Sequence, residues 1–214
     1  MQILPFSTEQ ERNTAMPAVL RQLEAGGLLA YPTETVYGFG SLLIPDALER
    51  LAALKGGRAD KAFLILIRSP RDLPQLEWTT SARRLAEHFW PGPLTLALRA
   101  PDDVVPARVK SGETVAVRVS PHSGVSAILD AIRQPLTSTS ANRPGEPPAL
   151  NMDQLKHALR DTKESVLILD GGELPASPPS SLVDCSVEPP RILREGVLPA
   201  DSLRGIFEPG NRSG

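Results

Sequence analysis

Hydroxyl, amide and guanidinium side chains gather at residues 138–145, which read Ser-Thr-Ser-Ala-Asn-Arg-Pro-Gly. A dense set of hydrogen-bonding groups like this suits an anion or a nucleotide better than a protein core. In α/β proteins the loops that follow strands carry much of the binding chemistry. The same residue types are also common in surface turns. The stretch alone therefore fits either a binding loop or an ordinary turn.

Two segments in the first third of the chain carry comparable chemistry. Residues 33–37 are polar directly after a predicted strand, so their hydroxyls could hold a small polar substrate or cap a turn. Residues 55–58 read Lys-Gly-Gly-Arg and, with Lys61, form a basic turn between a predicted helix and a predicted strand. Such a turn can neutralise phosphates, and a lysine also suits the end of a helix.

Two further segments lie later in the chain. Arg118 interrupts an apolar strand and so needs either a buried acid or a bound anion as its partner. Residues 180–184, with Arg194, again combine hydroxyls and a cation, a pattern that also caps turns. These segments gain weight as a site only if the fold brings them together.

Composition excludes several classes of protein. The net charge of −2 gives no global basic surface for nucleic acid, and 4% aromatic residues argue against a base-stacking platform. Cys185 is the single cysteine, and the three histidines are far apart, so no zinc or other metal motif is predicted. Phosphate-loop, dinucleotide-binding and nucleophile-elbow motifs are absent from the sequence. With no signal-peptide or membrane-spanning pattern, we expect a cytoplasmic protein.

Apolar periodicity and turn residues predict alternating helices and strands. The predicted helices are residues 14–25, 46–55, 81–89 and 125–132, and the predicted strands are residues 28–31, 62–67, 94–98, 114–119 and 166–170. Because the connections vary in length, we expect one α/β domain over residues 1–200 with a twisted, mixed parallel and antiparallel sheet flanked by helices. Residues 201–214 should form a C-terminal segment whose last residues, 208–214, are a flexible tail.

Taken in order, the polar segments resemble the YrdC-type (TsaC-like) family of L-threonylcarbamoyladenylate synthases in its short form. The motifs that carry the resemblance are Leu29-Ala-Tyr-Pro-Thr-Glu-Thr-Val-Tyr-Gly38, Leu54-Lys55 with Lys61, Phe89-Trp-Pro-Gly-Pro-Leu-Thr95, Val115-Ala-Val-Arg-Val119, Pro135-Leu-Thr-Ser-Thr-Ser-Ala-Asn142 with Gly145, residues 180–184, and Arg194-Glu-Gly196. They extend over most of the chain in the family's order. The resemblance implies the family's α/β fold with a concave basic cleft.

The resemblance also implies a reaction. L-threonine and bicarbonate or carbon dioxide combine at the threonine amine, and the resulting carboxylate attacks the α-phosphorus of ATP. Pyrophosphate leaves, and a separate transferase moves the threonylcarbamoyl group of the product to an adenosine in tRNA. Magnesium should accompany the ATP phosphates without a dedicated metal site. Direct binding of tRNA or double-stranded RNA is left open.

Residue roles carry over from the family motifs. The implied ATP-binding residues are Lys55, Arg58, Lys61, Thr114, Asn142 and Arg194, with Lys55 and Arg58 as the catalytic cations. The implied threonine-binding residues are Thr33, Thr35, Arg118, Ser140 and Ser180. Supporting roles fall to Tyr37, Ser138, Thr139 and Ser181. Positive charge at these positions would stabilise the negative charge that develops on the phosphate oxygens.

One motif departs from the family. The usual pattern of lysine, any residue, arginine is here Lys55-Gly56-Gly57-Arg58, and the usual proline after the second lysine is Ala62. A glycine-rich turn could bring Arg58 into the usual position, because glycine permits unusual backbone angles. The alternative hypotheses are a diverged RNA-binding protein of the same fold and a carbamoyl-adenylate site like that of hydrogenase maturation proteins. The synthase is the preferred hypothesis.

Overall fold

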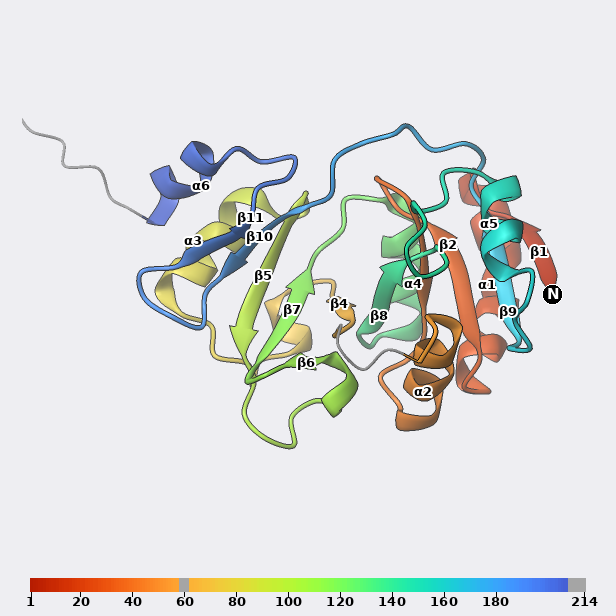
Figure 1. Cartoon of the computed structure of the whole chain (residues 1–214), viewed down its shortest axis with the longest axis horizontal. Coiled ribbons are helices and arrows are strands. Elements are labelled where there is room, and N and C mark those ends of the chain that lie inside the picture. The colour runs from red at the N-terminus through yellow and green to blue at the C-terminus, as the bar shows by residue number, and fades with distance from the viewer. Residues whose placement is uncertain (58–61, 208–214) are drawn as a thin grey trace, which may run out of the picture.

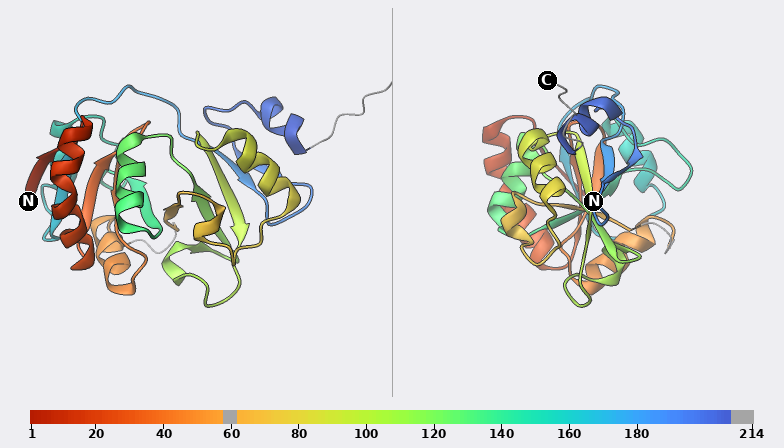
Figure 2. Two further views of the ribbon diagram at one scale, coloured as in Figure 1. Left: turned by 180° about the vertical axis from the view of Figure 1, so that it is seen from behind. Right: turned by 90° about the vertical axis from the view of Figure 1, so that its left-hand side faces the viewer.

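The computed structural model describes residues 1–57 and 62–207. These residues form one curved sheet of eleven strands with helices packed on both of its faces (Figures 1 and 2). The helices are α1 (Glu9–Glu24), α2 (Pro45–Leu54), α3 (Thr80–Phe89), α4 (Ser123–Ile132), α5 (Met152–Leu159) and α6 (Ala200–Phe207). The strands are β1 (Gln2–Pro5), β2 (Leu28–Pro32), β3 (Tyr37–Gly40), β4 (Leu64–Leu66), β5 (Leu94–Arg99), β6 (Lys110–Ser111), β7 (Thr114–Arg118), β8 (Leu136–Ser140), β9 (Val166–Asp170), β10 (Ser181–Asp184) and β11 (Arg191–Arg194).

The strand order is β1-β9-β2-β3-β8-β4-β7-β5-β10-β11, with β6 beside β7. Pairs β1–β9, β9–β2, β4–β7 and β5–β10 are parallel and the others are antiparallel. The mixed sheet predicted from the uneven connections is therefore confirmed. Strands β8 and β4 join the two halves of the sheet at the centre, where Leu64 lies opposite Ser138.

The strand β2 shows why both faces of the sheet are covered. All five of its residues are buried. Leu28 and Ala30 point into one apolar core, and Leu29 and Tyr31 point into the other, as the alternation of a strand requires. Continuous apolar runs are typical of strands with helices on both faces. The same logic holds for β9, which matches its predicted bounds.

The start of the first helix was predicted wrongly. The helix α1 begins at Glu9, five residues before the predicted cap Thr14. Thr8 is the N-cap, since its hydroxyl accepts from the Glu11 amide and the Glu11 carboxylate accepts from the Thr8 amide. The Thr14 hydroxyl instead donates to the Gln10 carbonyl inside the helix, 2.9 Å away.

Several elements were not predicted at all. The strands β3 and β8 are rich in glycine, serine and threonine, and β10 has only two apolar residues, so all three lack the apolar runs on which the prediction relied. Helix α6 lies in the predicted C-terminal segment, and its Leu203 is buried in the core against α3. The predicted flexible tail, residues 208–214, lies outside the described residues.

A long connection joins the two halves of the sheet from above. Residues 171–180 leave β9 on one side of the molecule and reach β10 on the other (Figure 1). This strap contains Pro175, Pro178 and Pro179 and has no helix or strand. It is anchored where the Leu174 amide donates to the Leu150 carbonyl and where Pro179 accepts from the Val197 amide. The strap thereby covers the centre of the sheet.

Candidate functional site

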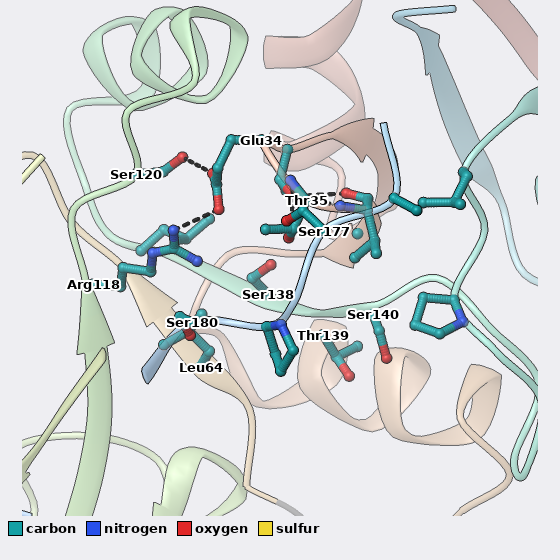
Figure 3. Close-up of a pocket in the computed structure, with 18 of the residues that line it drawn as sticks. Glu34, Thr35, Leu64, Arg118, Ser120, Ser138, Thr139, Ser140, Ser177 and Ser180 are labelled. Atoms are coloured by element: carbon teal, nitrogen blue, oxygen red, sulfur yellow. Dashed lines mark hydrogen bonds and ion pairs between the residues drawn. The ribbon is translucent and has the colours of Figure 1, made fainter. Parts of the chain in front are cut away.

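A large cavity lies under the strap, where the two halves of the sheet meet. It holds about 640 Å³ and is lined from the β2–β3 turn, β4, the ends of β7 and β8, the strap and β11. Figure 3 shows the hydroxyl, carboxylate and guanidinium groups that converge on it. Eight of the predicted site residues line this cavity: Thr33, Thr35, Arg118, Ser138, Thr139, Ser140, Ser180 and Arg194.

A buried ion pair forms one end of the cavity. Arg118 at the end of β7 is only 5% exposed, and its Nη2 lies 2.5 Å from Oε1 of Glu34. Its Nε donates to the Gly92 carbonyl at 2.9 Å, and the second carboxylate oxygen of Glu34 accepts from the Ser120 hydroxyl at 2.7 Å. Figure 3 shows the three side chains in this arrangement. Of the two partners predicted for Arg118, a buried acid or an anion, the acid is present.

This pair is held in a low-dielectric setting. Nη2 of Arg118 and Oε1 of Glu34 are both buried, and each finds its partner in the ion pair alone. Burial lowers the pKa of the Arg118 guanidinium, and the charge of Glu34 opposes that shift. Removal of either partner would leave an uncompensated buried charge.

The turn between β2 and β3 carries the threonines of the site. The Thr33 hydroxyl donates to the Val36 carbonyl at 2.6 Å and accepts from the amides of Thr35 and Val36 at 3.3 Å. These bonds close a compact turn of the kind that Ser and Thr favour. The Thr33 and Thr35 hydroxyls lie 3.3 Å apart at the cavity wall.

A second hydroxyl cluster lies at the far end of the strap. The Ser180 and Thr95 hydroxyls are 2.8 Å apart. Arg194, on the last strand, donates from Nε to the Ser180 carbonyl at 3.1 Å. Because the side chain of Arg194 reaches the cavity, its positive charge is available to an anion bound there.

The basic turn after α2 faces the loop after β8. The Lys55 ammonium donates to the Ser140 carbonyl at 2.8 Å, the Asn142 carbonyl at 2.9 Å and the Asn142 amide oxygen at 2.6 Å. Gly56 and Gly57 have φ of +81° and +71°, which favours glycine at both positions. Arg58 and Lys61 lie outside the described residues.

Some predicted residues lie away from the cavity. Thr114 begins β7, so it is at the opposite end of the strand from Arg118, about 13 Å away at the usual rise per residue. The side chain of Asn142 orders its own loop, bonding to Arg143 and Glu146 carbonyls, and lines a smaller neighbouring cavity. The hydroxyl of Ser181 is buried and accepts from the amides of Gly196 and Leu198.

Tyr37 supports the site from beneath. Its hydroxyl donates to the Gly172 carbonyl at 2.7 Å and accepts from the Gly171 amide at 3.0 Å, at the root of the strap. Burial raises the pKa of this phenol to about 12. Tyr37 therefore fixes where the strap begins.

Three polar lining residues received no role from the sequence. Glu34, Ser120 and Ser177 all face the cavity. Glu34 stands between two assigned threonines, so its position in the motif was a usable signal. The unpartnered charge of Arg118 was the other signal, because it required a nearby acid.

Within residues 1–57 and 62–207, histidine, cysteine, aspartate and glutamate form no group of three or more that could hold a metal ion. In the same part of the chain, no helix combines the length and apolar character that crossing a bilayer requires.

Comparison with known proteins gives consistent matches. A family model named Sua5_yciO_yrdC, described as "Telomere recombination", matches residues 21–196. A protein of Pyrococcus abyssi named threonylcarbamoyl-AMP synthase is 36% identical over 190 residues, which is 86% of this chain and 55% of that protein. A Vibrio campbellii protein of the same name is 33% identical over 83% of this chain and 97% of its own length.

The fold comparison agrees. The crystal structure of P. abyssi Sua5 complexed with L-threonine superposes with a TM-score of 0.86 at 33% identity, covering 97% of this chain and 61% of that one. The chain thus spans a little over half the length of the P. abyssi relative and nearly all of the Vibrio relative.

Proposed function

Because the chain belongs to the Sua5, YciO and YrdC family, we propose that it makes threonylcarbamoyl-AMP from L-threonine, bicarbonate or carbon dioxide, and ATP, with release of pyrophosphate. The product would serve the N6-threonylcarbamoyladenosine modification of tRNA. The observation that carries the proposal is the cavity under the strap, where Arg118, Arg194 and several hydroxyls converge. The relatives that carry the synthase name add support at 33–36% identity.

The amino acid would bind at the Arg118 end. Arg118 is the natural partner of the threonine carboxylate, because a guanidinium offers several donors in one plane. The hydroxyls of Thr33 and Thr35 line this part of the cavity, and those of Ser140 and Ser180 complete the predicted set. Such hydroxyls both donate and accept, so they suit a substrate that carries a hydroxyl of its own.

ATP would occupy the space between Arg194 and the loop that Lys55 contacts, at Ser140 and Asn142. The phosphoryl step develops negative charge on the phosphate oxygens, which cations stabilise electrostatically. Arg194 lines the cavity, and Lys55 fixes the loop of Ser140 and Asn142. Arg58 and Lys61 remain proposed phosphate ligands from the motif alone, and Thr114 does not join this group. A magnesium ion would enter with the ATP phosphates, which supply most of its ligands.

The reaction follows from bringing the two substrates together. The threonine ammonium first loses a proton, and the free amine then condenses with bicarbonate, releasing water, to give a carbamate. One carbamate oxygen attacks the α-phosphorus as the bond to the bridging oxygen of pyrophosphate breaks. The cavity's contribution is to hold the two reacting oxygens and phosphorus in line and to neutralise charge. A downstream transferase and tRNA are the proposed partners, in the cytoplasm.

A pyrophosphate-release assay tests the proposal. The purified chain is given ATP and bicarbonate with L-threonine, with L-alanine, or with no amino acid. We expect release that depends on both threonine and bicarbonate. Folded protein that releases no pyrophosphate, or releases it equally without an amino acid, would refute the synthase; RNA binding by such a protein would favour the RNA-binding alternative.

A further inference from the structure

The cavity has one acidic residue among the described residues that line it. Among the described residues around it, Glu34 alone carries a carboxylate, against two arginines. Its side chain is 20% exposed, and that of its partner Arg118 is 7% exposed. A carboxylate in such a place faces any positively charged group that enters the cavity.

Both members of the ion pair keep unused hydrogen-bonding capacity. The guanidinium has five N–H donors, of which one on Nε reaches Gly92 and one on Nη2 faces Glu34. Nη1 makes no hydrogen bond within the described residues, and it is not fully buried. The Glu34 carboxylate has about four acceptor sites, of which Arg118 and Ser120 use two.

Two further hydrogen bonds fix the pair in place. The Gly92 carbonyl holds Arg118, and the Ser120 hydroxyl holds Glu34. Ser120 is itself 4% exposed and accepts from the His122 amide at 3.1 Å, which ties it to the start of α4. The cation and the anion therefore stand side by side with their open edges toward the same space.

An α-amino acid matches this arrangement in charge. Its ammonium and carboxylate are attached to one carbon atom, so neighbouring groups of opposite sign can contact both at once. We propose that Glu34 binds the α-ammonium of the amino-acid substrate while Arg118 binds its carboxylate, so that the pair selects a free zwitterion. This inference rests on the proposed function, which places the amino acid at this end of the cavity.

The alternative roles of Glu34 are physically distinct. If Glu34 only oriented Arg118, its loss would weaken every carboxylate ligand equally. If it competed with the substrate for Arg118, its loss would strengthen every carboxylate ligand. The proposed role instead affects only ligands that carry the ammonium, because desolvating that cation without a counter-ion is costly.

The test compares two ligands by calorimetry in the presence of a non-hydrolysable ATP analogue. The ligands are L-threonine and (2S,3R)-2,3-dihydroxybutyrate, in which a hydroxyl replaces the amine. The variant is Glu34→Gln. The matched control is Glu113→Gln, since Glu113 also pairs with an arginine, Arg99 at 3.1 Å, but is exposed and outside the cavity.

In the wild type we expect L-threonine to bind at least about tenfold more tightly than the amine-free analogue. Glu34→Gln should weaken the binding of L-threonine about tenfold and change the affinity for the analogue by no more than about twofold to threefold. The ratio of the two affinities should therefore fall close to one. Glu113→Gln should leave both affinities unchanged. Because the readout is a ratio of affinities within one protein, partial loss of folded protein does not alter it.

Several results would overturn the inference. Equal weakening of both ligands by Glu34→Gln would assign Glu34 to the orientation of Arg118 alone, and tightening of both would make it a competitor. A wild type that binds both ligands equally would refute the ammonium contact without any variant, which covers the case where Glu34→Gln does not fold. If the wild type binds neither ligand, the proposed function fails first and this inference fails with it.

Discussion

Two cations at the site, Arg118 and Lys55, have different partners. At one end Arg118 is buried and paired with a carboxylate, so its charge is balanced before a substrate arrives. Beside the cavity, Lys55 donates to two carbonyls and to the Asn142 amide oxygen, all of them in the loop after β8. The first cation stands on the cavity wall, and the second holds the loop that forms the wall.

This difference teaches where each substitution should act. A cation paired with a carboxylate forms a site of mixed charge, so the pair can bind a substrate that carries both charges. A cation that binds carbonyls instead orders the backbone, so its loss changes the shape of the site. Substitutions at the two ends should therefore separate in which substrate they affect and in how much stability they cost.

The largest effect is expected at Arg118. Arg118→Met removes the proposed carboxylate ligand and leaves the partly buried Glu34 without its cation. Unfolding by urea should show a loss of about 3–5 kcal/mol. Threonine-dependent turnover should fall roughly 100-fold or more.

The double variant Arg118→Met with Glu34→Met separates these two losses. Replacing a buried ion pair by apolar side chains of similar size is often neutral for stability. The double variant should therefore regain most of the unfolding free energy and none of the activity. Recovery of activity along with stability would show that Arg118 is structural only.

A smaller effect is expected at Lys55. Lys55→Met keeps the apolar stem but removes the three contacts to Ser140 and Asn142. If this loop borders the nucleotide, the KM for ATP should rise about tenfold while the KM for threonine changes by less than about threefold. Lys156→Met, at an exposed position on α5, is the control. A larger effect on threonine than on ATP would reverse the assignment of the two ends.

A still smaller effect is expected for Tyr37→Phe, which should loosen the strap. The variant loses the hydroxyl that bonds to the Gly171 amide and the Gly172 carbonyl. We expect about 1–2 kcal/mol of lost stability and faster hydrogen exchange in residues 171–180. Tyr31→Phe is the control, because its hydroxyl bonds to the Thr137 carbonyl at 3.3 Å and not to residues of the strap. Unchanged exchange in the strap would contradict the anchoring role of Tyr37.

The smallest effect concerns pH. Nδ1 of His122 accepts from the Gly124 amide at 3.2 Å and so caps α4 only when it is unprotonated. Burial lowers the pKa of His122 below its ordinary value of 6.5, with Glu34 opposing the shift. The unfolded chain therefore binds more protons, and stability should decline as the pH falls below 6.5 toward the folded pKa.

The expected loss is about 1 kcal/mol, the usual worth of a cap. Unfolding curves of the wild type and of His122→Asn at a series of pH values measure it. The asparagine can cap without titrating, so the difference between the two proteins should shrink at high pH. Parallel pH profiles would exclude His122 as the source.

Those parts of the fold that the sequence predicts well are apolar. The strands β2 and β9 are buried on both faces, so their composition reveals them. By contrast, β8 reads Leu-Thr-Ser-Thr-Ser and gains its place from pairing with β3 and β4, which no local pattern encodes. The start of α1 was missed because its N-cap, Thr8, lies seven residues before Ala15, the first buried residue of the helix.

The site divides in a similar way. Residues with a distinctive side chain at the end of a strand, such as Arg118 as the last residue of β7 and Ser180 just before β10, were predicted and do line the cavity. Glu34 was not assigned, because its role depends on a partner from β7 that only the folded sheet brings within reach. Thr114 shares a strand with Arg118 yet lies at its other end, a distance that the motif alone does not convey.

The most direct test of the account is the identity of the product. The wild-type chain would be incubated with ATP, L-threonine and ¹³C-bicarbonate, and the nucleotides analysed by mass spectrometry. We predict a threonylcarbamoyl adenylate that carries the heavy carbon and accumulates in step with pyrophosphate. An adenylate without that carbon or without threonine, or no adenylate from folded protein, would contradict the proposed synthase.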